Sequence, residues 1–219
     1  MAHLKRMAMP KTWPIARKGC KYIMSPLPGK NIKFCLPATI ILRDLLKIAS
    51  NKKEVRRIIK NKELLVNNRE VKEEAFPIGF SDVISIPKIK KFYKVSCNSK
   101  GKLSIEEINE DKAYSKYSKV INKTVLKKNK LQLNFLDGGN IIVGKDYKAN
   151  VNDCIVIDLK NKKIAKKIPY EKGAYVKVMG GKHFGKEGII ENIENKIITI
   201  KTNSGVIKTI NKNLFICEK

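Results

Sequence analysis

The amino-acid sequence predicts an α+β protein made of several small domains, and three observations lead to that fold class. Residues 35–91 have the pattern of two short helices followed by strands. Residues 92–170 contain short strands separated by turns at regular intervals, which is typical of an all-β, barrel-like domain. Residues 171–219 repeat this pattern on a smaller scale and predict a compact five-stranded barrel.

Composition places the chain among folded proteins without a membrane anchor. An apolar fraction of 42% is sufficient for hydrophobic cores, and no run of 18 apolar residues predicts a transmembrane helix. The N-terminus lacks the continuous apolar segment of a signal peptide, so we expect a cytoplasmic protein. The five cysteines are widely spaced, which predicts neither a zinc site nor a disulfide framework and fits a reducing compartment.

The net charge of +27 is the strongest compositional signal. Residues 1–34, 35–91, 92–170 and 171–219 carry excesses of 8, 6, 9 and 4 positive charges, so the charge is spread over the whole chain. Such a chain repels itself unless a polyanion neutralises it, and nucleic acid does so by releasing counterions from its phosphates. A compositional bias from Arg to Lys would leave the net charge unchanged, so the excess itself predicts a partner.

Residues 1–34 contain no acidic residue and are interrupted by Pro and Gly. This pattern favours either a disordered tail or a basic arm that becomes ordered on RNA. We favour the arm, because Trp13 and Tyr22 can stack on bases or anchor the segment. The candidates for RNA contact in this arm are Lys5, Arg6, Lys11, Trp13, Arg17, Lys18 and Lys21.

The first helix of the next segment is predicted to begin at Leu36, next to a proline that the first turn tolerates. Apolar residues recur at i, i+4 and i+7 from Ile41 to Ile48, which predicts one buried face. Arg43 in this helix is a further candidate for RNA contact.

A second helix is predicted to follow, with Asn51 as its N-cap and Glu54 reaching back to the first turn. Val55, Ile58 and Ile59 lie on one arc of this helix. The basic residues cover an arc of about 140° on the other side; they are Lys52, Lys53, Arg56, Arg57 and Lys60. A Lys-rich helix is often only a solvated surface, but the charge of the whole chain favours a phosphate-binding face.

Strands complete each predicted unit. In the helical unit they are expected at 64–66, 69–71 and 79–86, with an Asn-Asn turn between the first two and a turn at Pro87 closing the unit. A helical turn is expected at 109–113 in the central unit. The central strands are expected at 92–97, 102–105, 117–126, 131–135, 140–143, 154–159 and 164–168. The C-terminal strands are expected at 174–178, 189–193, 197–202, 206–210 and 214–216.

A glycine-rich stretch in the C-terminal unit has two interpretations. Gly180, Gly185 and Lys186 almost match a phosphate-binding P-loop, but Glu187 occupies the position that needs Ser or Thr, and a strand follows instead of a helix. The stretch is more similar to a KOW motif, a strand–loop–strand element of RNA-associated barrels. Lys182 and Lys186 are therefore candidates for RNA contact.

The sequence offers little for catalysis. His3 and His183 are the two histidines, and neither lies near a cluster of Cys or carboxylate residues in the sequence. The acidic residues of the central unit are scattered and form no pair suited to acid–base chemistry. We therefore expect no catalytic residues, no metal and no cofactor, and a protein that is not an enzyme.

Several motifs, taken in order, resemble the archaeal and eukaryotic small-subunit ribosomal protein family S4e. No single motif carries this resemblance, which covers nearly the whole chain. The motifs are His-Leu-Lys-Arg and Ala-x-Pro-Lys-x-Trp13, Cys35-Leu-Pro and Ile41-Leu-Arg43, Phe76-Pro-x-Gly79-Phe-x-Asp-Val-Ile-Ser-Ile86, Val151-Asn-Asp153 and Ile157-Asp-Leu159, and Gly180-Gly and Gly185-x-x-Gly188.

The resemblance implies an S4-type RNA-binding domain at 35–91, a family-specific β domain at 92–170 and a KOW barrel at 171–219, after the basic arm at 1–34. It implies a structural role in the cytoplasmic ribosome. The implied partners are small-subunit ribosomal RNA and neighbouring ribosomal proteins, with no membrane and no small-molecule substrate. Members of this family usually continue into a basic C-terminal tail. This chain stops at Lys219, so RNA contacts of such a tail are not carried over.

Two alternatives remain open from the sequence. S4-type domains are also found in pseudouridine synthases, although a catalytic domain of that kind would need a larger α/β fold than this chain can hold. A KOW barrel is also compatible with a transcription-associated RNA-binding module.

Overall fold

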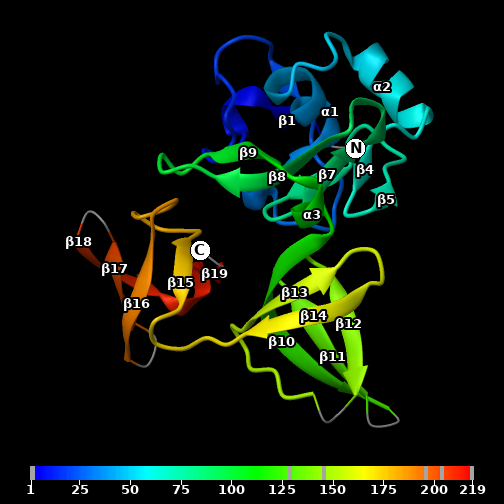
Figure 1. The fold of residues 1–219 in the computed structure, drawn as a ribbon. Helices are drawn as coiled ribbons and strands as arrows, with labels where there is room; N and C mark the ends of the chain where they lie inside the picture. The colour runs from blue at the N-terminus through cyan, green and yellow to red at the C-terminus, as the bar shows by residue number, and fades with distance from the viewer. Residues whose placement is uncertain (1–2, 128–129, 145–146, 195–196, 203–204, 218–219) are drawn as a thin grey trace. The chain divides into compact units, whose positions relative to one another are not determined.

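The computed structural model describes residues 3–127, 130–144, 147–194, 197–202 and 205–217. Its contacts divide the chain into two compact units, one formed by residues 1–97 with 102–116 and the other by residues 98–101 with 117–219. Both units are built mainly from antiparallel strands, and the α-helices of the described residues belong to the first (Figure 1). The predicted α+β class with barrel-like sheets is confirmed.

A five-stranded sheet forms the base of the first unit, in the order β5-β4-β7-β8-β9. Its strands are β4 (Leu65–Val66), β5 (Arg69–Glu70), β7 (Val83–Ile86), β8 (Lys91–Cys97) and β9 (Leu103–Ile108). The predicted boundary near residue 91 therefore falls inside a sheet, because Ile84 of β7 pairs with Tyr93 of β8. Pro87–Ile89 forms only a tight turn between these strands, and α3 (Glu110–Ala113) follows the sheet.

The first predicted helix is shorter than its periodicity suggests. Cys35–Pro37 forms strand β3, which pairs with β6 (Pro77–Gly79), and α1 begins only at Ala38 (Ala38–Ile40). The chain continues through Ile41–Leu45 with π-helical geometry, in which the Leu46 N–H donates to the Ile41 carbonyl at 2.9 Å. Lys47 then adopts a left-handed φ of 53° and ends the helix.

The second helix, α2 (Lys52–Lys60), begins directly after Asn51 as predicted and lies on the outside of the first unit (Figure 1). Its N-terminus is capped by one of the two expected side chains. Glu54 Oε2 accepts a hydrogen bond from the Ser50 N–H at 2.7 Å, whereas Asn51 makes no side-chain cap. The carboxylate of Glu54 thus accepts from the N–H of Ser50, one residue before the Asn51 N–H that a capping box would use.

The second unit begins with the sheet β12-β11-β10-β13-β14. Val120, Leu133, Phe135 and Ile155 form its buried core, and β10 contains a bulge after Val120. The strands are β10 (Ser115–Leu126), β11 (Lys130–Phe135), β12 (Asn140–Gly144), β13 (Cys154–Asp158) and β14 (Lys163–Ile168), close to the predicted positions.

The five predicted C-terminal strands are confirmed and form a sheet in the order β18-β17-β16-β15-β19. They are β15 (Tyr175–Val178), β16 (Glu187–Glu194), β17 (Ile197–Thr202), β18 (Gly205–Ile210) and β19 (Leu214–Ile216). Gly188 is required by close strand packing, because a Cβ at this position would lie 2.3 Å from the Lys201 carbonyl oxygen.

A buried lysine, Lys119, links the two sheets of the second unit. Its side chain is 4% exposed, and its Nζ donates to the carbonyl oxygens of Asn211 at 2.8 Å and Leu214 at 2.7 Å. Burial disfavours the charged ammonium and lowers the pKa of Lys119 to about 8.

An unfolded lysine has a pKa of about 10.4. Between about pH 8 and that value, Lys119 is therefore protonated in the unfolded chain but has lost its proton in the folded one. Lys119 should therefore make the protein more stable as the pH rises through this window. Urea unfolding of the wild type and of Lys119→Met across pH 7–11 measures this. We expect the free energy of unfolding of the wild type to rise relative to that of Lys119→Met within the window, and the difference between them to be constant below it. A difference that stays constant over the whole pH range would contradict the lowered pKa of Lys119.

All five cysteines are free thiols, consistent with the widely spaced sequence positions. Burial is the main reason that the pKa of Cys35 is raised to about 11. No helix in the described part of the chain is long and apolar enough to cross a membrane.

Candidate nucleic-acid interface

Helix α2 presents the charge arc that its sequence predicts. Val55 and Ile59 are buried in the core of the first unit, and Ile58 is partly buried beside them. The five basic residues Lys52, Lys53, Arg56, Arg57 and Lys60 are exposed. The apolar face fixes the orientation of the helix, so the cations are held on a rigid surface.

Two of these five cations share a carboxylate. Lys52 Nζ lies 2.8 Å from Glu74 Oε1, and Arg56 Nη2 lies 3.2 Å from the same oxygen. Partial burial raises the pKa of Glu74, but the hydrogen bonds from Lys52 and Arg56 outweigh it, and the net shift is downward. The charge of this pair of cations is therefore partly balanced within the protein.

The other three cations form a row that follows one side of the helix. Lys53, Arg57 and Lys60 are spaced i, i+4 and i+7, so neighbours in the row are adjacent on the helix surface. No ion pair joins them to an acidic group in the described residues. We call Lys53, Arg57 and Lys60 the α2 row; it is the part of the predicted surface best suited to bind phosphates.

The N-terminal arm is folded, which corrects the expectation that it becomes ordered on RNA. Strands β1 (Leu4–Lys5) and β2 (Tyr22–Ile23) pair with each other. Met9 and Trp13 belong to the core of the first unit, with exposed fractions of 3% and 1%. The indole Nε1 donates to the Ile32 carbonyl at 3.1 Å. Trp13 is thus an anchor of the arm, which is one of the two roles predicted for it, and its burial leaves no ring face open to a base in this structure.

Because Trp13 is the single tryptophan of the chain, its fluorescence reports on this anchor directly. We expect emission typical of a buried indole, weak quenching by acrylamide, and no change when ribosomal RNA is added. A fluorescence titration measures all three. Strong quenching in the free protein, or a large RNA-dependent change with the arm still folded, would contradict the buried position.

Two of the predicted arginines also hold the arm together. Arg6 Nε donates to the Ala16 carbonyl at 2.8 Å. Arg17 donates to the carbonyls of Met7 at 3.2 Å and Met9 at 3.0 Å. Neutral carbonyl partners leave both guanidinium charges uncompensated, so these residues order the arm and still contribute positive potential.

Four predicted lysines of the arm, Lys5, Lys11, Lys18 and Lys21, are exposed. Lys21 Nζ lies 5.5 Å from the centroid of the Tyr22 ring, which is 49% exposed. Lys21 thus lies over the Tyr22 ring, and the His3 ring lies 5.3 Å from it between centroids, so a base would stack on the part of the Tyr22 ring that these two residues leave exposed.

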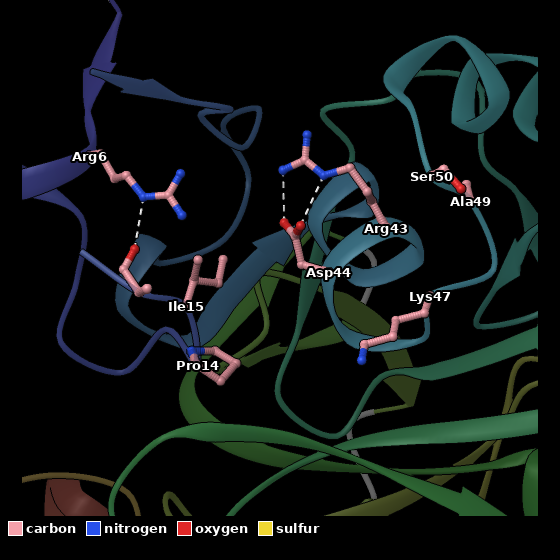
Figure 2. Close-up of a pocket in the computed structure, with 9 residues that line it drawn as sticks. Arg6, Pro14, Ile15, Arg43, Asp44, Lys47, Ala49 and Ser50 are labelled. Atoms are coloured by element: carbon pink, nitrogen blue, oxygen red, sulfur yellow. Dashed lines mark hydrogen bonds and ion pairs between the residues drawn. The ribbon is translucent and has the colours of Figure 1, made fainter. Parts of the chain in front are cut away.

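A pocket of about 720 Å³ brings the arm and the first helix together (Figure 2). Arg6 extends from the arm, whereas Arg43 and Lys47 come from the helix and the residues that follow it. Arg43 donates to both carboxylate oxygens of Asp44, at 2.9 and 2.8 Å, and the hydrogen bond with Asp44 is the main cause of its raised pKa. With three cations and one carboxylate, the pocket is suited to an anionic group.

Asp82 forms a buried ionic cluster that the sequence did not reveal. Its carboxylate is fully buried, pairs with Lys30 and lies 2.9 Å from Lys116 Nζ. It also accepts hydrogen bonds from the Asn67 side chain at 2.9 Å and the Gly79 N–H at 2.6 Å. Burial raises the pKa of Asp82, but the charges of Lys116 and Lys30 outweigh it and hold the pKa well below its usual range.

The Asp82 cluster joins three segments of the first unit that are distant in the sequence. Lys30 comes from the end of the arm, and Asn67 lies in the left-handed Asn-Asn turn between β4 and β5, with a φ of 50°. The side-chain oxygen of Asn67 also accepts from the Val83 N–H at 3.0 Å. One carboxylate therefore ties the arm, the turn and the sheet of the first unit together.

The glycine-rich loop between β15 and β16 contains the last two predicted residues. Lys182 is exposed, and Lys186 is partly buried. Glu187 begins β16 and pairs with Lys177 at 2.7 Å, so the loop leads into a strand as predicted. An anionic side chain and a strand at these positions do not make a P-loop.

The described residues contain no group of three His, Cys, Asp or Glu side chains that could hold a metal ion. What the geometry does provide is positive charge on folded surfaces: the α2 row, the lysines of the arm, and the cations at the pocket. These surfaces suit a polyanion.

Family models match four parts of the chain. They are described as Ribosomal family S4e (residues 89–164), the RS4NT (NUC023) domain (residues 2–29), the KOW motif (residues 172–201) and the S4 domain (residues 42–84). The S4 match contains the α2 row, and the KOW match contains the glycine-rich loop.

Known proteins of similar length match nearly the whole chain. The small ribosomal subunit protein eS4 of Methanothermobacter thermautotrophicus is 39% identical over 94% of this chain and 85% of its own. That of Nanoarchaeum equitans is 37% identical over 87% and 82%. The crystal structure of the 30S ribosomal protein S4e from Thermoplasma acidophilum matches with a TM-score of 0.71 and 28% identity, over 85% of this chain and 95% of that one. The chain belongs to the S4e family of ribosomal proteins.

Proposed function

We propose that this protein is a structural constituent of the small ribosomal subunit that binds and stabilises small-subunit ribosomal RNA. Membership of the S4e family supports this role, as does the net charge of +27. The observation that carries it at the level of residues is the α2 row, three exposed cations without a described counterion on a buried apolar base.

The α2 row would bind phosphates and fix the register of the protein on RNA without reading its sequence. The exposed lysines of the arm would extend this contact within the first unit, and Arg6, Arg43 and Lys47 would take a phosphate at the pocket. Lys182 and Lys186 would make a separate contact from the second unit. Recognition would then depend on the shape of the RNA, because the deep major groove of an A-form helix excludes side chains.

We also propose that the protein acts in the cytoplasmic ribosome beside other small-subunit proteins, and that it has neither catalytic activity nor a cofactor. The residues predicted for contact are cations and one tryptophan, without a nucleophile or an acid–base pair among them, which supports a binding role.

Sedimentation tests this function. The tagged protein should co-sediment with small ribosomal subunits at low salt and be released at high salt, because its contacts are largely ionic. Recovery only in the free soluble fraction would contradict the proposal, and so would co-purification with RNA polymerase in place of ribosomal particles. Crosslinking within purified subunits would then identify the RNA helices that the α2 row contacts.

A further inference from the structure

The outward side of the central sheet carries a group of uncharged polar side chains that the proposed contacts do not use. Asn122, Asn134 and Asn140 pair across β10, β11 and β12, and the next row consists of Thr124, Gln132 and Ile142. The inward residues of the same strands, such as Leu133 and Phe135, form the core. We call the six outward residues the amide face.

Hydrogen bonds within the amide face hold its side chains in place. Gln132 Nε2 donates to Asn134 Oδ1 at 2.6 Å, and Asn134 Nδ2 donates to Thr124 Oγ1 at 3.1 Å. This chain of bonds leaves Gln132 Oε1 as an acceptor. The exposed Asn122 and Asn140 flank it on the neighbouring strands and each carry an amide group. The surface thus offers fixed donors and acceptors without charge.

The lack of charge is unusual for this protein. Lys163, Lys166 and Lys167 lie along β14 at the other end of the same sheet, whereas the six positions of the amide face are uncharged. The next row on this side of the sheet, Leu126, Lys130 and Gly144, adds one lysine at the border of the face. β12 is an end strand, where natural sheets normally place charged residues to prevent pairing with another chain. Here the outward residues are Asn140 and Ile142, the latter 55% exposed. Such an edge is better suited to being covered than to remaining in water.

We propose that the amide face docks against the shallow minor groove of an A-form RNA helix, with its amides bonded to ribose 2′-hydroxyls and base edges. This inference rests on the proposed function, which makes RNA the partner. The wide minor groove of A-form RNA presents 2′-hydroxyls that both donate and accept, and side-chain amides match both roles. A protein partner would require an apolar or aromatic centre, and Ile142 is the one apolar member of this face.

The contact has a thermodynamic signature that separates it from phosphate binding. Losing a neutral amide contact lowers affinity by the same factor at every salt concentration, because no counterion is released there. Losing a lysine–phosphate contact instead reduces the slope of log affinity against log salt concentration.

The experiment uses the full chain and an RNA duplex of about 16 base pairs, together with the same duplex carrying 2′-fluoro groups. The fluoro duplex keeps the A-form but cannot donate from the 2′ position. We expect the wild type to bind the hydroxyl duplex about tenfold more tightly, as one or two hydrogen bonds would give. The variant Asn122→Ala, Gln132→Ala, Asn140→Ala should bind both duplexes equally, with an unchanged salt slope.

A matched control removes two exposed asparagines outside the face, Asn109→Ala and Asn150→Ala, and should retain the preference for the hydroxyl duplex. The wild-type comparison needs no substitution, so it remains decisive if the triple variant is unstable in a thermal melt. Equal binding of the two duplexes by the wild type would overturn the proposal. A preference that survives in a folded triple variant would overturn it too, by placing the 2′-hydroxyl contact elsewhere.

The two proposals fail in different ways. If only the amide-face proposal is wrong, the wild type will still bind RNA in a salt-dependent manner and co-sediment with small subunits. If the wild type neither binds RNA nor co-sediments with small subunits, the ribosomal function itself is contradicted. If the amide face binds a neighbouring protein, the triple variant will bind the two duplexes as the wild type does and will lose that neighbour in assembled subunits.

Discussion

Reversing the charge of the α2 row, by Lys53→Glu, Arg57→Glu and Lys60→Glu, should weaken binding to small-subunit ribosomal RNA by a factor on the order of 100 at low salt. The slope of log affinity against log salt concentration should become shallower by about 3, one for each phosphate contact. Filter binding or fluorescence anisotropy at several salt concentrations measures both quantities.

The control for this variant keeps the same change in net charge. Lys72→Glu, Lys90→Glu and Lys112→Glu replace exposed lysines of the same unit that lie outside the predicted contacts. We expect this control to lose only a few-fold in affinity, through the weaker field of the whole protein. Equal losses in the two variants would show that the α2 row makes no specific contact.

Replacing the buried carboxylate by Asp82→Asn should destabilise the protein at neutral pH by about 3–5 kcal/mol, the range for breaking one side of a buried ion pair. The amide would remove the negative charge that lies 2.9 Å from the buried Lys116 Nζ and would place an N–H₂ group against other donors. Urea unfolding at pH 7 measures the loss. Glu70→Gln, which removes an exposed pair with Lys62, is the matched control and should change stability by less than about 1 kcal/mol.

The same variant should reveal the sign of the pH dependence. Because the folded-state pKa of Asp82 lies below its usual range, its stabilising contribution is complete above about pH 4. The contribution is lost as the pH falls from there toward the folded-state pKa. The difference between the wild type and Asp82→Asn should therefore be large at pH 7 and smaller at pH 3. A difference that grows in acid would contradict the assigned shift.

Local periodicity predicted the parts of the interface that depend on it. The spacing of Val55, Ile58 and Ile59 fixes which side of α2 is buried, and the opposite side follows from helix geometry. What periodicity could not show was that Lys52 and Arg56 share Glu74, a residue that lies after the helix and two strands. Contacts between distant segments decide which cations remain available.

Composition alone could not predict whether the N-terminal arm is folded. An acid-free segment with several prolines has the same composition whether it is disordered or folded. Its state depends on the burial of Trp13 and on the bond of its indole to Ile32, 19 residues away. The carbonyls that accept from Arg6 and Arg17 are likewise set by the folded path of the arm.

The sequence patterns also did not predict two features of the backbone, the π-helical stretch at Ile41–Leu45 and the strand at Cys35–Pro37. The apolar spacing from Ile41 to Ile48 fits a regular helix, but the backbone switches to π-helical bonding and ends at Lys47. Strand pairing of Cys35–Pro37 with β6 removes the first predicted turn. Similarly, the alternation in Lys91–Cys97 predicts a strand but does not say which sheet it joins.

The folded arm has a consequence for the energetics of association. A segment that orders only on its partner loses conformational entropy at that moment, and its binding shows the large negative heat-capacity change of coupled folding. Here Trp13, Arg6 and Arg17 fix the arm in the free protein, so that loss belongs to folding. Docking on the subunit should then resemble the meeting of two preformed surfaces, with a heat-capacity change set by the contact area alone.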